Sequence, residues 1–322
     1  MQHFVLPHKN VVSVDDMDVT WIDEIFGLTS RIKTAYLCGP DSPQWLHFST
    51  RLQNRMLFTL FYEPSTRTRF SFETAMQCLG GMVTTTEAAK LFSSAAKGEM
   101  LRDTIHTCAR YGINRSAIVL RHHERGSAKE AAALGVCPII NAGDGDGEHP
   151  TQALLDIFTI LEQFEQGSNK TLTLVGDLKN GRTVHSLIKL AIKMRMVGQF
   201  QLVAPAGLEL PEEYQTAIEA AGLQYTASKQ LSNEVVRKSD VIYMTRAQKE
   251  RMAEGASVSG DSYALKMSLV EHLKQSAMVM HPLPRNEELP VELDGLKQAR
   301  YFDQVENGLY LRMALLLHIF DK

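Results

Sequence analysis

The chain has 322 residues, a formal net charge of −3 at pH 7 and an apolar content of 44%. A chain of this length is longer than a domain with a single hydrophobic core usually is, which predicts two domains of about 150 residues each. Because the net charge is close to neutral and the basic residues form no long block, the composition gives no electrostatic support for binding of nucleic acid. The start lacks the pattern of a signal peptide, and the longest apolar run, near Ala314–Phe320, is too short to cross a bilayer. These features are typical of a cytoplasmic enzyme that binds neither nucleic acid nor membrane.

The four cysteines lie far apart in the sequence and form no CxxC pair. Such spacing matches neither a disulfide framework nor a zinc site. We therefore expect reduced, partly buried thiols and no metal at Cys38, Cys78, Cys108 and Cys137.

Short apolar strands alternate with helices along the chain, in two series. A helix is predicted over 14–34, and the first strand follows at 56–61. Short strands that alternate with longer helices predict βαβ units and parallel sheets. The expected fold class is α/β, with two doubly wound domains that each hold a central parallel sheet flanked by helices. Further strands are predicted at 116–120, 138–140, 172–175, 201–204, 241–244 and 277–280, and further helices at 98–112 and 126–135.

Residues 61–73 read Phe-Tyr-Glu-Pro-Ser-Thr-Arg-Thr-Arg-Phe-Ser-Phe-Glu and lead from the first strand into a helix. A helix N-terminus offers free N–H groups and the positive end of the helix dipole, which suit an anion. Hydroxyls add donors, and arginine adds a planar fork that fits a phosphate. A capped helix with surface arginines would need one hydroxyl, so the surplus predicts a phosphate site. The polar residues concerned are Ser65, Thr66, Arg67, Thr68 and Arg69.

Polar residues follow the ends of several predicted strands. In parallel sheets, ligands bind beyond the carboxyl ends of the strands. Independent surface residues would not gather at six strand ends, whereas one cleft between two α/β domains accounts for all of them. We therefore expect the active site in the interdomain cleft. The residues are Ser65, Arg121, His149, Arg182, Arg246 and the 281–285 segment.

The acidic, glycine-rich segment 141–152 allows two interpretations. Calcium is one, but an EF-hand needs glycine at its sixth position and glutamate at its twelfth. Counted from Asp144, those positions hold His149 and Leu155, so the segment is not an EF-hand. Its glycines instead permit a tight turn before a helix, on which His149 and Gln152 share a face. This arrangement favours ligand contact over an ordinary satisfied histidine.

Residues 176–183 nearly match the Walker A template, because they follow an apolar strand and precede a helical pattern. Arg182 replaces the lysine of that template, and arginine delivers a broad fork where lysine delivers a point charge. The spacing also fails GxGxxG. We interpret Arg182 as a clamp for a carboxylate or phosphate, with a structural ion pair as the alternative.

Three further segments give weaker evidence of ligand binding. Residues 93–98 are small and polar, which predicts a flexible, solvated loop. Arg246 and Gln248 follow an apolar strand and face the same direction if the chain stays extended, although surface positions are the alternative. The segment 281–285 has two prolines, which fix φ and remove N–H donors, so its carbonyls are presented rigidly.

Together these segments resemble the transcarbamoylase superfamily and, within it, the aspartate carbamoyltransferase family. The resemblance covers most of the chain. The Ser-Thr-Arg-Thr-Arg helix start and the His-Pro-Thr-Gln segment mark the superfamily. The segments 176–185, 244–251 and 281–285 resemble the aspartate branch, since ornithine enzymes typically have a cysteine where this chain has Pro282.

The resemblance implies transfer of the carbamoyl group of carbamoyl phosphate to the α-amine of L-aspartate, an early step of pyrimidine biosynthesis, without a metal or other cofactor. It implies that Thr68, Arg121 and His149 polarise the carbonyl oxygen. Gln152 and the backbone carbonyls of Pro282 and Leu283 would accept from the carbamoyl NH2. The implied catalytic residues are Arg67, Thr68, Lys97, Arg121 and His149. The implied carbamoyl phosphate ligands are Ser65, Thr66, Arg67, Thr68, Ser93, Arg121, His149, Gln152, Pro282 and Leu283, and the implied aspartate ligands are Lys97, Arg182, Arg246 and Gln248.

The resemblance also implies a domain division and an assembly. Residues 1–149 would bind carbamoyl phosphate, completed by a C-terminal helix at 305–322, and residues 150–304 would bind aspartate. The loop with Ser93 and Lys97 would enter a neighbouring subunit's site, which implies a homotrimer with shared active sites. Some relatives have two adjacent lysines there, whereas this chain has Ala96 before Lys97. A regulatory subunit or a higher assembly is compatible with the sequence.

Three other functions compete with this expectation. One is transcarbamoylation of another amino acid, such as ornithine. The second is hydrolysis of a nucleotide by a P-loop-like site at 176–183. The third is a regulatory binding module without activity on the same fold.

Overall fold

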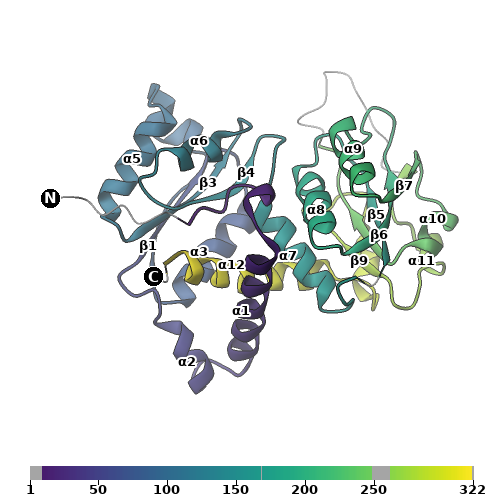
Figure 1. Cartoon of the computed structure of the whole chain (residues 1–322), viewed down its shortest axis with the longest axis horizontal. Helices are drawn as coiled ribbons and strands as arrows, with labels where there is room; N and C mark the ends of the chain where they lie inside the picture. The colour runs from purple at the N-terminus through teal and green to yellow at the C-terminus, as the bar shows by residue number, and fades with distance from the viewer. Residues whose placement is uncertain (1–8, 168, 249–261, 321–322) are drawn as a thin grey trace. The chain divides into compact units, whose positions relative to one another are not determined.

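The computed structural model describes residues 9–167, 169–248 and 262–320. The chain divides into two compact units (Figure 1). Unit 1 comprises Met1–Thr151 and Glu306–Lys322, and unit 2 comprises Gln152–Val305. The helices α7 (Pro150–Leu161) and α12 (Tyr301–Phe320) each begin in one unit and continue into the other.

Unit 1 holds a four-stranded parallel sheet with the order β2-β1-β3-β4. A segment near the N-terminus lies beside β4, because Val11 forms a parallel bridge with Ile140. This segment therefore extends the sheet at its β4 edge. The strands are β1 (Met56–Phe61), β2 (Met82–Thr86), β3 (Ser116–His122) and β4 (Ile139–Asp144).

Helices cover both faces of this sheet. On one face, α5 and α6 bury Ile105 and Ala131 against Phe58 and Ile118 of the strands. On the other face lies α3, where the Glu73 carboxylate accepts a hydrogen bond from Thr59 Oγ1 at 2.9 Å. The helices of this unit are η1 (Val14–Asp16), α1 (Val19–Leu37), α2 (Pro43–Ser49), α3 (Thr66–Cys78), α4 (Ala89–Phe92), η2 (Ser94–Lys97), α5 (Leu101–Gly112) and α6 (Ser127–Ala133).

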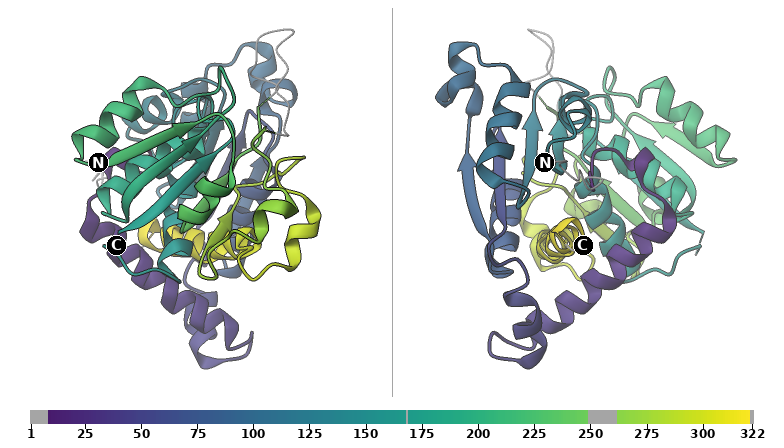
Figure 2. Two further views of the ribbon diagram at one scale, coloured as in Figure 1. Left: turned by 90° about the vertical axis from the view of Figure 1, so that its right-hand side faces the viewer. Right: turned by 60° about the vertical axis from the view of Figure 1, so that its left-hand side comes forward.

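Unit 2 holds a five-stranded parallel sheet with the order β7-β6-β5-β8-β9. The left panel of Figure 2 shows this sheet with helices on both sides. On one face, Leu269 of α11 and Val236 of α10 pack with Ile242 and Val279 of the strands. The strands are β5 (Lys170–Val175), β6 (Val197–Val203), β7 (Gln224–Ser228), β8 (Val241–Met244) and β9 (Met278–Met280); the helices are α8 (Arg182–Lys193), α9 (Glu212–Ala220), α10 (Asn233–Lys238), α11 (Met267–Val270) and η5 (Val291–Gly295).

The α/β fold class with two doubly wound parallel sheets is confirmed, but several predicted boundaries are wrong. The helix predicted over 14–34 begins at Val19, because the Asp18 carboxylate caps it by accepting from the Trp21 N–H at 2.8 Å. The strand predicted at 138–140 continues to Asp144. The loop predicted at 93–98 contains the short helix η2.

Candidate active site

The strand order of unit 1 creates one topological switch point. Chain connections run outward from β1 to β2 on one side and from β3 to β4 on the other. In such sheets the ligand crevice opens at the carboxyl ends of the two central strands. The segment Ser65–Thr68 follows β1, and Arg121 lies next to last in β3. The predicted phosphate-binding residues therefore occupy the switch point of unit 1.

The start of α3 suits an anion. Ser65 is the N-cap residue, and its hydroxyl makes no capping hydrogen bond. The first turn of any α-helix presents N–H groups that no helical carbonyl accepts, at the positive end of the dipole. In α3 this turn carries Thr66, Arg67 and Thr68. Backbone donors, hydroxyls and a guanidinium thus come from one turn.

Thr68 and His149 meet in unit 1. Thr68 Oγ1 lies 3.4 Å from His149 Nε2, and both side chains are buried. Arg121 lies at the carboxyl end of the same sheet, where its Nη1 donates to the Ala142 carbonyl of β4 at 3.1 Å. Its Nε lies 3.7 Å from a Glu63 carboxylate oxygen. The structure thus brings Thr68 and His149 together and anchors Arg121 at the end of the neighbouring strand.

Two carboxylates to which the sequence assigned no role, those of Asp144 and Glu148, position the loop before His149. Asp144 accepts hydrogen bonds from the Glu148 N–H and the Gly126 N–H, each at 2.9 Å. The Glu148 carboxylate accepts from Ser13 Oγ at 2.8 Å and from the Val14 N–H at 2.9 Å. The residue directly before His149 is therefore tied to the N-terminal segment.

Ser93 and Lys97 lie at the two ends of η2. Ser93 Oγ caps this helix by accepting from the Ala95 N–H at 3.1 Å, and it donates to the Ala89 carbonyl. Lys97 is exposed. The Ser93 hydroxyl is therefore used locally, whereas Lys97 lies at an exposed position.

Unit 2 also has a topological switch point, with different polar residues beside it. Its strand order places the switch point between β5 and β8. Arg182 begins the helix after β5 and is 7% exposed. Gln248 follows β8 and donates through Nε2 to the Asn180 carbonyl at 2.8 Å, while its N–H donates to Asp177 at 3.2 Å. The loops after β5 and β8, which carry the predicted aspartate ligands, are thus joined.

Gly176 permits the close approach of these two loops. Its φ is +113°, a conformation that favours glycine, and an added Cβ would lie 2.0 Å from the Thr245 carbonyl oxygen. The Thr245 N–H also donates to the Val175 carbonyl at 2.7 Å. Arg246, directly after Thr245, is therefore held near the end of β5.

The segment 176–183 does not have the geometry of a phosphate-binding P-loop. Such a loop leaves its backbone N–H groups available to phosphate oxygens. Here the N–H groups of Leu178 and Lys179 both donate to the Leu208 carbonyl, at 3.0 and 3.1 Å. The Asn180 N–H donates to Asp177 Oδ1 at 2.9 Å. These internal bonds argue against nucleotide hydrolysis at this loop.

The segment after β9 is fixed around a buried histidine. The Leu283 N–H donates to His281 Nδ1 at 2.7 Å, so the ring proton is on Nε2, which lies 3.0 Å from Glu288 Oε1. Burial disfavours the Glu288 anion, but the hydrogen bonds from His281 and from the Asn286 N–H outweigh it and lower the pKa of Glu288. Leu283 has a φ of +55°, an uncommon conformation for leucine that this bond helps to hold. The carbonyls of Pro282 and Leu283 therefore belong to a defined loop.

Gln152 lies on α7 and is 9% exposed. Its Nε2 donates to Asp156 Oδ1 at 2.9 Å, one helical turn away. The amide oxygen is thereby left as the acceptor of this side chain. Asp156 was not identified from the sequence.

The described residues also bear on metals and membranes. In residues 9–167, 169–248 and 262–320 no group of three His, Cys, Asp or Glu side chains could hold a metal ion. No helix within these ranges is long and apolar enough to cross a membrane.

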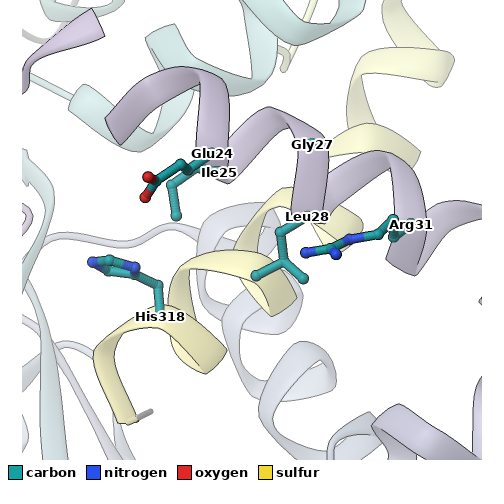
Figure 3. Close-up of a pocket in the computed structure, with 6 residues that line it drawn as sticks. All are labelled: Glu24, Ile25, Gly27, Leu28, Arg31 and His318. Atoms are coloured by element: carbon teal, nitrogen blue, oxygen red, sulfur yellow. The ribbon is translucent and has the colours of Figure 1, made fainter. Parts of the chain in front are cut away.

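A pocket in unit 1 contains none of the predicted site residues (Figure 3). It lies between α1 and α12, where His318 Nε2 accepts a hydrogen bond from Trp21 Nε1 at 2.9 Å. Its lining residues are Glu24, Ile25, Gly27, Leu28, Arg31 and His318. We assign this pocket no part in the chemistry.

The fold is a two-unit α/β fold, and each unit has candidate anion-binding residues at its switch point. The family profile "Aspartate/ornithine carbamoyltransferase, carbamoyl-P binding domain" matches residues 9–162. The profile "Aspartate/ornithine carbamoyltransferase, Asp/Orn binding domain" matches residues 168–319. The chain belongs to the aspartate/ornithine carbamoyltransferase family.

Individual relatives agree with this assignment. The aspartate carbamoyltransferase catalytic subunit of Thermoplasma acidophilum is 44% identical over 321 residues, which are 98% of this chain and 99% of that protein. The chloroplastic aspartate carbamoyltransferase of Arabidopsis thaliana is 46% identical over 268 residues, covering 82% of this chain and 67% of that protein. The crystal structure of Trypanosoma cruzi aspartate transcarbamoylase with carbamoyl phosphate has a TM-score of 0.87 and 37% identity, covering 97% of this chain and 96% of that one.

Proposed function

We propose that the protein transfers the carbamoyl group of carbamoyl phosphate to the α-amine of L-aspartate, giving N-carbamoyl-L-aspartate and phosphate in pyrimidine biosynthesis. The observation that carries this proposal is the chemistry of the two switch points. In unit 1, the start of α3 offers donors for a phosphate, beside Thr68 and His149. In unit 2, Arg182 and Arg246 follow β5 and β8, the two strands at the switch point, and their guanidinium groups suit carboxylates.

The residues of unit 1 bind and activate carbamoyl phosphate in this proposal. Its phosphate binds to Ser65, Thr66, Arg67 and Thr68, and Arg121 bridges the phosphate and the carbonyl. Lys97 of η2 and its N-cap Ser93 complete this set, and the Ser93 hydroxyl then donates to the phosphate in place of the Ala89 carbonyl. The carbonyl oxygen faces Thr68, Arg121 and His149. As the amine attacks, this oxygen becomes negative, and each aligned donor lowers the barrier by roughly 3–4 kcal/mol.

The reaction needs no covalent intermediate on the protein. The aspartate nitrogen forms a bond to the carbonyl carbon, giving a tetrahedral intermediate. The carbonyl re-forms as the bond from carbon to the phosphate oxygen breaks, and the departing phosphate accepts the proton from the amine. Fixed donors contribute most in such a reaction, because they are already oriented when charge develops.

The residues of unit 2 orient both substrates in this proposal. The oxygen of Gln152 and the carbonyls of Pro282 and Leu283 accept hydrogen bonds from the carbamoyl NH2. Arg182 and Arg246 bind the two aspartate carboxylates, together with Gln248 and with Lys97 of unit 1. Two guanidinium groups attract a dicarboxylate and repel the ammonium of ornithine, which favours aspartate as acceptor.

The assembly and the location are part of the proposal. We propose a homotrimer in which Lys97 acts in the site of a neighbouring subunit. The exposed position of Lys97 at the end of η2 supports this role. The proposed domain roles are those expected from the sequence, and the proposed location is cytoplasmic.

The test is a direct comparison of acceptors. Purified protein is incubated with carbamoyl phosphate and either L-aspartate or L-ornithine, and phosphate release and carbamoyl products are measured by mass spectrometry. We expect N-carbamoyl-aspartate with stoichiometric phosphate, and only background product with ornithine. Product formed from ornithine alone would reverse the assignment. Magnesium-dependent ATP hydrolysis that is lost in Arg182→Ala would favour the nucleotide hydrolase instead.

A further inference from the structure

Asp156 of α7 is fully buried, with 0% of its surface exposed. Its carboxylate accepts hydrogen bonds from the side chains of Gln152, Gln304 and Tyr243. Oδ1 accepts from Gln152 Nε2 at 2.9 Å and from Gln304 Nε2 at 2.7 Å. Oδ2 accepts from the Tyr243 hydroxyl at 2.7 Å. All four residues belong to unit 2. A buried carboxylate with three donors is a fixed acceptor, because moving any partner away would leave it undersatisfied.

This acceptor sets the direction of the Gln152 amide. A carboxylate can only accept hydrogen bonds, so the NH2 group of Gln152 must face Asp156. The amide oxygen of Gln152 is then directed away from Asp156 as an acceptor. The opposite orientation would set two acceptors against each other inside the protein. The polarity of Gln152 is thus dictated by Asp156.

The same carboxylate sets the direction of a second amide. Gln304 also turns its NH2 toward Asp156, which leaves its Oε1 to accept from the His281 N–H at 2.8 Å. His281 begins the loop after β9 and receives the Leu283 N–H at 2.7 Å. One carboxylate therefore fixes both Gln152 and the loop that carries the carbonyls of Pro282 and Leu283.

We propose that Asp156 is a positioning residue for the carbamoyl NH2 group, which it serves by holding Gln152 and, through Gln304, the 281–283 loop as hydrogen-bond acceptors. The inference rests on the proposed function, in which these acceptors face that NH2. Without Asp156, Gln152 is free to present its own NH2 to the substrate, and two donors then face each other. Asp156 itself touches no substrate atom in this role.

The test compares two substitutions of Asp156 that keep the branched shape and the number of its non-hydrogen side-chain atoms. Asp156→Asn can keep its oxygen toward the two glutamines and turn its NH2 toward the Tyr243 oxygen, which can accept. Asp156→Leu removes the acceptor. We measure the Kd of carbamoyl phosphate and of inorganic phosphate by calorimetry, and KM and kcat with aspartate. Inorganic phosphate lacks the carbamoyl group and so reports on the phosphate-binding residues alone.

We expect Asp156→Leu to weaken carbamoyl phosphate binding about tenfold or more. The hydrogen bond from the carbamoyl NH2 to Gln152 is lost, and the NH2 groups of Gln152 and the substrate then face each other. Its inorganic phosphate Kd should stay within about twofold of wild type. Asp156→Asn should retain carbamoyl phosphate binding within about threefold. The control Tyr243→Phe removes the third donor, and it should lower the unfolding temperature while leaving both Kd values unchanged.

An Asp156→Leu protein with the wild-type Kd for carbamoyl phosphate would overturn the inference. Equal weakening of carbamoyl phosphate and inorganic phosphate would also overturn it, because the effect would then be general distortion. If Asp156→Leu does not fold, Gln304→Met tests the same connection, and an unchanged carbamoyl phosphate Kd in that variant rejects it. Since these Kd values need no amino acid, a protein that binds carbamoyl phosphate but does not carbamoylate aspartate would refute the proposed function and leave this inference measurable.

Discussion

Thr68 Oγ1 lies 3.4 Å from His149 Nε2, although 81 positions separate the two residues along the chain. Thr68 belongs to the helix after β1, and His149 to the loop after β4. The sheet places β3 between these two strands, so the contact requires α3 and the loop after β4 to meet beyond the end of β3. Two donors that converge from different strands can act on one oxygen.

Removal of the Thr68 hydroxyl should slow the reaction more than it weakens binding. Thr68→Val keeps the shape of the side chain and removes its donor. We expect kcat to fall about 10²–10³-fold, as for loss of one oxyanion donor. Thr68→Ser retains a hydroxyl and should stay within about tenfold of wild type. A Thr68→Val enzyme with wild-type kcat in steady-state assays would show that Thr68 does not act on the carbonyl.

The N-terminal segment should support activity through Glu148. Glu148→Ala removes the acceptor for Ser13 and Val14. We expect a loss of about 1–3 kcal/mol in unfolding free energy, together with a lower kcat, because the loop before His149 is released. Urea unfolding and steady-state kinetics measure the two effects.

Glu148→Gln is the matched control for this prediction. Its amide oxygen can accept from the Val14 N–H, and its NH2 can donate to Ser13 Oγ. We expect this variant to lose less than about 1 kcal/mol and to keep most of its activity. Equal losses in both variants would mean that the charge of Glu148 matters and the two hydrogen bonds do not.

The sequence predicted the central strands of both sheets because each contains a short apolar run. It did not predict β2 or β7. Both are edge strands, and three of the five residues in each are exposed. The edge strands β4 and β9 were predicted because they are buried and contain short apolar runs, whereas β2 and β7 are mostly exposed and carry no apolar run that hydrophobic periodicity could reveal.

The candidate ligands were predictable because they follow strand ends within short motifs. The groups that hold them were not. Asp156 binds Tyr243 and Gln304, which are 87 and 148 positions away. Glu148 binds residues 134 and 135 positions away. No local pattern marks such long-range partners, which only the folded sheet brings together.

A shared active site should allow two inactive variants to restore each other. Lys97→Ala and Arg67→Ala each remove a different part of the proposed site. If Lys97 acts in a neighbouring subunit, about one quarter of the interfaces in randomly mixed trimers carry both intact residues. Activity should therefore reappear when the two proteins exchange subunits. Mixtures as inactive as either parent, with exchange verified by mass spectrometry, would place Lys97 in its own subunit's site.

The Asp294 carboxylate should stabilise unit 2 in a pH-dependent manner. Hydrogen bonds from Arg285 and then Tyr301 lower the pKa of Asp294 from 3.8 to about 2. A lowered pKa in the folded state gives stability that is present above pH 3.8 and is lost as the pH falls toward 2. Since the side chain of Asp294 is 39% exposed, solvent weakens this effect.

The comparison of wild type with Asp294→Asn isolates this contribution. The difference in unfolding free energy, measured by urea titration, should be constant from pH 5 to 7 and should shrink between about pH 4 and pH 2. The difference shrinks because both proteins are neutral at position 294 once the Asp294 carboxyl is protonated. A difference that grows as the pH falls would contradict the assignment.

The central claim is that one end of the substrate pair binds at the start of α3 and the other at the arginines of unit 2. A crystal structure with a bisubstrate analogue that joins a phosphonate to aspartate tests it most directly. We predict phosphonate oxygens at about 2.7–3.2 Å from Thr68 and the first turn of α3, with the carboxylates on Arg182 and Arg246. A phosphonate bound away from α3, or carboxylates that contact neither arginine, would contradict the account.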